Sequence, residues 1–150
     1  MSDPSGNGES ELDLETLGLF VEESEEAFLR MEKTLLAVEG APERLSADAL
    51  RALFRDFHTI KGTSGFLGLA RLQSVSHAAE DMLAVLREGK LVAHAAHVAG
   101  MLEVLDVLRR QLEFVKAHHW ESDEDVGTLV ERIRAMSAPD CRPADKAPAD

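Results

Sequence analysis

The sequence predicts an all-α protein, an antiparallel four-helix bundle with one additional C-terminal helix. Apolar residues recur at three- and four-residue steps through almost the whole of 12–136, which is the spacing of amphipathic helices. No window shows the strict alternation of a half-buried strand, and tyrosine, which is favoured in strands, is absent. Short turns between long helices favour antiparallel neighbours, and this predicts the bundle.

The first helix is expected over about 14–38. Gly40, Ala41 and Pro42 end it, because glycine and proline are common just after a helix. Eight acidic residues stand against two basic ones over 11–33, and we interpret the acidic face of this helix as a solvated surface. Its apolar positions are Leu17, Phe20, Val21, Phe28, Met31, Leu35 and Val38.

The second helix is expected to start after Ser46, whose hydroxyl suits an N-cap, and to reach a stretch of glycines at Gly62, Gly65 and Gly68. Over 51–72 four basic residues stand against one acidic residue, so this helix is a basic stripe on an acidic protein. Its predicted apolar stripe is Leu50, Leu53, Phe54, Phe57 and Ile60.

Three further amphipathic segments complete the bundle. The third helix is expected over about 70–87, where Gly89 follows it, and the fourth over about 93–117. A last helix is expected over 122–136, because Ser122 and Asp125 have the spacing of an N-terminal capping pattern.

One folded domain is expected over 12–136. Residues 1–11 and 137–150 lack apolar periodicity and are rich in Gly, Ser, Pro, Ala and Asp, so they are predicted to be a disordered N-terminus and a flexible tail that resembles the start of an interdomain linker. The only cysteine, Cys141, excludes an internal disulfide and fits a reducing compartment. No apolar run approaches the ~20 residues of a membrane span, and no secretory signal is evident, so we expect a cytoplasmic protein.

The net charge of −12 argues against two classes of partner. Nucleic acids and anionic membrane surfaces are bound through an excess of basic residues, which this chain lacks. We therefore expect neither partner.

The segment most informative about chemistry surrounds His58. On a helix, His58, Lys61, Gly62 and Gly65 lie at i, i+3, i+4 and i+7, on one stripe beside the buried one. Glycine costs about 1 kcal/mol relative to alanine within a helix, so these glycines require a reason. Small residues would let another protein approach an exposed imidazole, and the lysine would supply a cation where a new anion forms. This pattern is expected of a nucleophilic histidine.

The third helix offers a carboxylate for this imidazole. In an antiparallel pair its middle faces His58, and a carboxylate that accepts a hydrogen bond from Nδ1 would leave the Nε2 lone pair bare. Glu80 and its neighbour Asp81 are both available for this role.

Other site types fit less well. The glycine spacing matches neither the dinucleotide fingerprint nor the phosphate-binding loop, and His77 with Glu80 reverses the order of a di-iron motif. His94 and His97 share a helix face, but no second pair of metal ligands is evident. The remaining histidines are interpreted as structural; they are His118 and His119, beside Trp120.

One pattern runs through residues 58–68 and continues with Leu72, His77, Glu80, Leu83 and residues 86–89. It resembles the N-terminal histidine phosphotransfer (HPt) domain of chemotaxis-type histidine kinases, the CheA family. The resemblance extends upstream through 20–24 and covers most of 12–117. It implies an HPt-type bundle.

The resemblance also implies a function. The chain would be a phosphoryl carrier and not itself an enzyme: His58 would accept a phosphoryl group from the ATP-binding domain of a CheA-type kinase and pass it to an aspartate of CheY- or CheB-like receiver domains. No cofactor would be bound by this chain, since ATP and Mg²⁺ belong to the kinase domain and Mg²⁺ to the receiver. The isolated domain is expected to be a monomer.

Roles for particular residues follow from the same resemblance. Lys61 would neutralise the phosphoryl oxygens, Glu80 would orient the imidazole, and His77 would join that network. The partner-docking positions would be Gly62 and Gly65, with Phe57 and Ile60 contributing to the docking surface or to the core. The alternative hypothesis is a helical adaptor that is never phosphorylated, or a metal-binding bundle that uses His58, His77 and Glu80.

Overall fold

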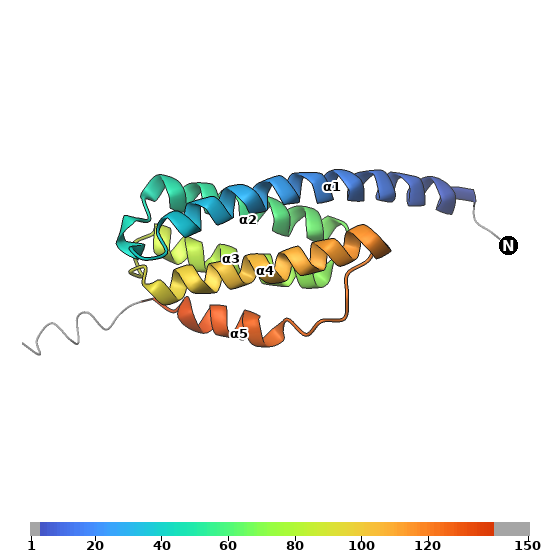
Figure 1. Cartoon of the computed structure of the whole chain (residues 1–150). Coiled ribbons are helices and arrows are strands. Elements are labelled where there is room, and N and C mark those ends of the chain that lie inside the picture. Colours follow the sequence, from blue (N-terminus) through green and yellow to red (C-terminus); the bar gives the residue numbers. More distant parts are fainter. Residues whose placement is uncertain (1–3, 140–150) are drawn as a thin grey trace, which may run out of the picture.

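The computed structural model describes residues 4–139, with side chains from residue 14, and it is all-helical over that range. Four long helices form an antiparallel bundle, and a fifth lies along its outside (Figure 1). This confirms the predicted fold class. The helices are α1 (Pro4–Ala37), α2 (Ala47–Phe66), α3 (Ala70–Arg87), α4 (Ala95–His118) and α5 (Gly127–Met136), with a 3-10 turn, η1 (Pro42–Arg44), after α1.

The core lies between the four long helices. α2 and α3 share the most extensive contact, and α3 also contacts α4 and α5, so α3 is the central element. Burial of apolar side chains is the main stabilising contribution. Large side chains that are almost fully buried come from each of the long helices, for example Phe28, Leu53, Phe57, Leu72, Met82, Met101 and Leu108. Among the described helices, none is long and apolar enough to span a bilayer.

α1 differs most from the expected boundaries. It begins at Pro4, whereas residues 1–11 were expected to lack structure; residues 1–3 and 140–150, including Cys141, lie outside the described residues. Proline suits a first helical turn, because its fixed φ is helical and the N–H it lacks would have no partner there. The first turns of α1 extend past the end of the bundle (Figure 1).

Local capping explains the ends of α2. The Ser46 hydroxyl accepts a hydrogen bond from the Ala49 N–H at 3.0 Å, which confirms the predicted N-cap. At the other end, Gly68 has φ +76° and the Leu69 N–H donates to the Ser64 carbonyl at 2.8 Å. This is the glycine-dependent Schellman motif, so Gly68 is explained by the helix end alone.

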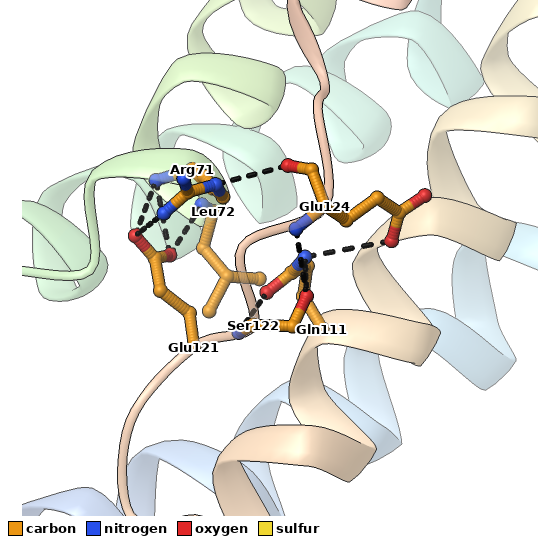
Figure 2. Close-up of polar contacts among 6 residues, drawn as sticks. All are labelled: Arg71, Leu72, Gln111, Glu121, Ser122 and Glu124. Atoms are coloured by element: carbon orange, nitrogen blue, oxygen red, sulfur yellow. Dashed lines mark hydrogen bonds and ion pairs between the residues drawn. The ribbon is translucent and has the colours of Figure 1, made fainter.

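α3 is capped by a residue distant in sequence (Figure 2). Leu69, at the N-cap position of α3, makes no side-chain capping hydrogen bond. The buried carboxylate of Glu121 takes this role: the Arg71 N–H donates to its two oxygens at 2.9 and 3.0 Å, and the Leu72 N–H donates to Oε2 at 3.2 Å. The Arg71 side chain donates from Nε to the carbonyl of Glu124 at 2.9 Å. The connection between α4 and α5 is thereby fixed to the start of α3 (Figure 2).

The predicted start of the last helix is wrong. α5 begins at Gly127, because Ser122 is used by a tertiary contact: its hydroxyl accepts from Gln111 Nε2 at 2.6 Å and its N–H donates to Gln111 Oε1 at 3.0 Å (Figure 2). Asp125 instead accepts from the Gly127 N–H at 2.9 Å. The segment before α5 is therefore a non-helical connection held by tertiary hydrogen bonds.

Candidate functional site

The site forms where the middle of α2 faces the middle of α3. His58 and Lys61 lie one turn apart on α2, and Glu80 lies opposite them on α3. His58 Nδ1 is hydrogen-bonded to Glu80 Oε2, and Lys61 Nζ donates to Glu80 Oε1 at 2.8 Å. Glu80, not Asp81, is thus the carboxylate that contacts the imidazole.

The electrostatics of the pair determine which ring nitrogen carries the proton. Burial of the Glu80 carboxyl raises its pKa, but the hydrogen bonds from Lys61 and His58 outweigh burial, and the pKa lies below its ordinary value. The carboxylate is therefore ionised at neutral pH and can only accept hydrogen bonds. Nδ1 must carry the hydrogen in this contact, so in the neutral ring Nε2 keeps its lone pair.

The imidazole is accessible although its carboxylate partner is not. The side chain of His58 is 61% exposed and that of Glu80 is 7% exposed. Within the described residues, no hydrogen bond to His58 Nε2 is present. The His58 ring is therefore held at Nδ1 by the buried Glu80, while Nε2, the nitrogen able to act as a nucleophile, is accessible to a partner.

The two glycines beside the histidine have different surroundings. A Cβ built on Gly62 meets no atom within 4 Å, so nothing in the fold requires glycine there. A Cβ on Gly65 would lie 2.4 Å from Gln73 Nε2, at the far end of an exposed side chain. Gly62 therefore leaves open space one turn from His58, whereas the space at Gly65 is taken by the flexible end of the Gln73 side chain from α3.

Phe57 and Ile60 do not belong to the docking surface. Their exposed fractions are 0% and 3%, and both pack in the core, so the predicted docking role is wrong and the alternative role in core packing is confirmed. Phe54, expected on the buried stripe, is instead half-buried and stacks on the His58 ring, with centroids 5.9 Å apart and planes inclined by 10°. Sequence reasoning missed this contact, although the four-residue spacing of two rings on a helix indicates it.

His77 contacts a different carboxylate from the one that holds His58. Its Nε2 lies 3.5 Å from Asp81 Oδ2, which also lies 3.6 Å from Nη1 of Arg134 on α5. Ligand atoms of His77, Glu80 and Asp81 come within 4.8 Å of one another, as in a metal site. Both carboxylates already have cationic partners, so a metal ion would have to displace existing ion pairs.

The other histidines belong to helix ends. His97 Nδ1 accepts from the His94 N–H at 2.9 Å and its Nε2 donates to the Met136 carbonyl at 3.1 Å, which ties the start of α4 to the end of α5. His118 stacks on Phe114 with centroids 4.0 Å apart, and His119 ends α4 with φ +63°. These contacts support the structural interpretation.

Comparisons with known proteins found a matching family model and similar sequences. The family model described as Hpt domain matches residues 15–118. The chain is 34% identical over 135 residues to chemotaxis protein CheA of Treponema pallidum, covering 90% of this chain and 16% of that protein. It is 31% identical over 120 residues to CheA of Halobacterium salinarum, covering 80% and 18%. The chain thus spans less than a fifth of the length of these curated relatives.

A solved structure shares the fold. The phosphorylated P1 domain of CheA3 from R. sphaeroides, solved in complex with CheY6, is similar with a TM-score of 0.75 and 29% sequence identity. The match covers 83% of this chain and 96% of that chain. The fold is therefore shared over nearly the whole of that chain.

Proposed function

Because the chain belongs to the Hpt domain family, we propose that it is the histidine phosphotransfer domain of a chemotaxis-type histidine kinase. Its partners are the ATP-binding domain of that kinase and receiver domains of response regulators, and it works in the cytoplasm. The observation that carries the proposal is the exposed imidazole whose Nδ1 is bonded to a buried, ionised Glu80.

In the first step, the Nε2 lone pair of His58 attacks the γ-phosphorus of ATP held by the kinase domain. A P–N bond forms, the bond to the β-phosphate oxygen breaks, and ADP leaves with that electron pair. The proton on Nδ1 stays in place, so the ring becomes positively charged and the Glu80 carboxylate stabilises this charge. Lys61, one turn away, supplies a cation for the phosphoryl oxygens.

In the second step, a carboxylate oxygen of the receiver attacks the same phosphorus. The P–N bond breaks, its electron pair returns to Nε2, and the neutral ring is restored. The chain is a carrier in both steps, because ATP and Mg²⁺ are held by the kinase domain and Mg²⁺ by the receiver. Gly62 serves both partners, since the open space beside it lets a protein surface approach the imidazole.

The experiment is phosphate incorporation from labelled ATP with a CheA kinase core that lacks its own HPt domain. We expect no label on the chain with ATP alone, label with the kinase core, and loss of that label from the chain when a receiver is added. The label should be absent in His58→Gln, whereas His77→Gln should still accept it, since His77 contacts Asp81 instead of His58. Label retained in His58→Gln would overturn the proposal.

A further inference from the structure

An aromatic contact holds the ring of His58, in addition to the Glu80 hydrogen bond. Phe54 and His58 lie four residues apart on α2, where side chains are neighbours on one face of a helix. Their ring centroids are 5.9 Å apart and the ring planes are inclined by 10°, which is an offset parallel stack. The guanidinium carbon of Arg87, the last residue of α3, lies 4.4 Å from the centre of the Phe54 ring, within cation–π distance.

The hydrogen bond and the stack restrain different motions. A hydrogen bond at Nδ1 tolerates a range of angles, and χ2 of a histidine is a broad torsion, so Glu80 alone lets the exposed ring tilt. A flat side chain parallel to the ring opposes that tilt. Nε2 can attack phosphorus only when its lone pair points along the line of displacement, so a tilted ring is unproductive.

Arg87 acts on Phe54 and not on the reacting atoms. Phe54 is half-buried at the edge of α2, and the guanidinium over its ring restrains it from the end of the neighbouring helix. This contact brings the C-terminus of α3 to the second turn of α2. The orientation of the imidazole therefore depends on two side chains of α3, with Glu80 acting directly and Arg87 acting through Phe54.

We infer that Phe54 is a positioning residue for phosphoryl transfer, which sets the plane of the His58 ring, and that Arg87 supports it. The inference rests on the proposed function, because it assigns a role in the reaction at His58. It predicts that Phe54 affects the rate of the chemical step and not the affinity for the kinase domain. A residue of the docking surface would do the opposite.

The test compares Phe54→Leu, Phe54→Tyr and Arg87→Met with the wild-type chain as substrates of the same kinase core. Phe54→Leu should lower kcat about two- to tenfold, the range expected for an aromatic pair, with KM unchanged. Phe54→Tyr keeps the flat ring and should retain the wild-type kcat. Arg87→Met removes only the guanidinium from an exposed residue and should give a smaller loss.

The matched control is Phe66→Leu, the same substitution on the same helix at a side chain that is 80% exposed and makes no ring contact with His58. It should leave kcat unchanged. NMR relaxation of the His58 ring gives a readout without kinase: the ring should become more mobile in Phe54→Leu and not in Phe66→Leu. Thermal unfolding of each variant verifies that it is folded. If Phe54→Leu does not fold, Arg87→Met provides the test.

A folded Phe54→Leu chain with wild-type kcat and wild-type ring mobility, or one that changes only KM, would overturn the inference. The His58→Gln chain in the same assay separates this outcome from a failure of the proposed function. If His58→Gln still takes label, the proposed function fails. If it takes none while Phe54→Leu behaves as wild type, only the positioning role is lost.

Discussion

Replacing Glu80 by glutamine should slow phosphorylation of His58 by about 10- to 100-fold while changing the shape of the side chain very little. Each carboxylate oxygen now takes one donor, Lys61 Nζ at Oε1 and His58 Nδ1 at Oε2. Glutamine has a single acceptor oxygen, and an ammonium group can only donate, so Lys61 takes that oxygen. The amide NH₂ then faces His58 Nδ1.

An NH₂ group opposite Nδ1 favours the wrong tautomer. Nδ1 would accept the hydrogen bond, the ring proton would move to Nε2, and the nucleophilic lone pair would be lost from the exposed side. The positive charge formed during transfer would also lose its counter-ion. A hydrogen bond to a charged group contributes about 1.5–3 kcal/mol, and 1.36 kcal/mol corresponds to a factor of ten in rate, which gives the expected range.

The assay is single-turnover labelling of the chain by a kinase core, combined with ¹⁵N NMR of the His58 ring to identify the protonated nitrogen. The control is Asp81→Asn, which removes the neighbouring carboxylate that contacts His77 and Arg134 but not His58. This control should be labelled at the wild-type rate. A Glu80→Gln chain that is labelled as fast as the control, with Nδ1 still protonated, would refute the reasoning.

Three other predictions concern stability. Gly62→Ala should stabilise the domain by up to about 1 kcal/mol in urea unfolding, because the added methyl group meets nothing in the fold and alanine favours a helix. The same substitution should slow phosphoryl transfer, because the methyl group would project onto the docking side. A destabilised Gly62→Ala chain would contradict this. Glu121→Ala should destabilise the domain by about 2 kcal/mol, because two helix N–H groups lose their acceptor. Label uptake by this variant at neutral pH should be unchanged. A wild-type urea midpoint would be inconsistent with the capping role of Glu121. The Lys61–Glu80 ion pair should contribute fully above pH 4.5, the ordinary pKa of the Glu80 carboxyl, and this contribution should disappear as pH falls through the lower folded pKa. A urea-unfolding difference between wild type and Glu80→Gln that does not change between pH 7 and pH 3 would argue against it.

Much of the site could be predicted because it depends on helical period. His58, Lys61 and Glu80 lie on helices whose apolar stripes are regular, so their faces and the approach of α2 to α3 follow from the sequence. The same period explains why Phe57 and Ile60 lie in the core, as their place on the apolar stripe predicts, and not on the docking surface. These residues adjoin His58 in sequence, but each residue turns about 100° around the helix axis, so positions one before and two after it point away from its face.

Tertiary contacts account for most of the other differences. Ser122 has the local pattern of an N-cap, but Gln111 of α4 competes for it and the helix starts five residues later. Glu121 caps a helix start 50 residues before it, and no local pattern predicts a buried carboxylate in that role. The choice between Glu80 and Asp81 also needed the structure, because neighbouring residues on α3 differ only in the direction of their side chains.

The central claim is that His58 reacts through Nε2 because Glu80 holds Nδ1. It is tested most directly by identifying the phosphorylated atom in the labelled chain, using mass spectrometry to find the residue and ³¹P–¹⁵N NMR to distinguish the two ring nitrogens. The account predicts a phosphoryl group on Nε2 of His58. A phosphoryl group on Nδ1, or on any other residue, would contradict it.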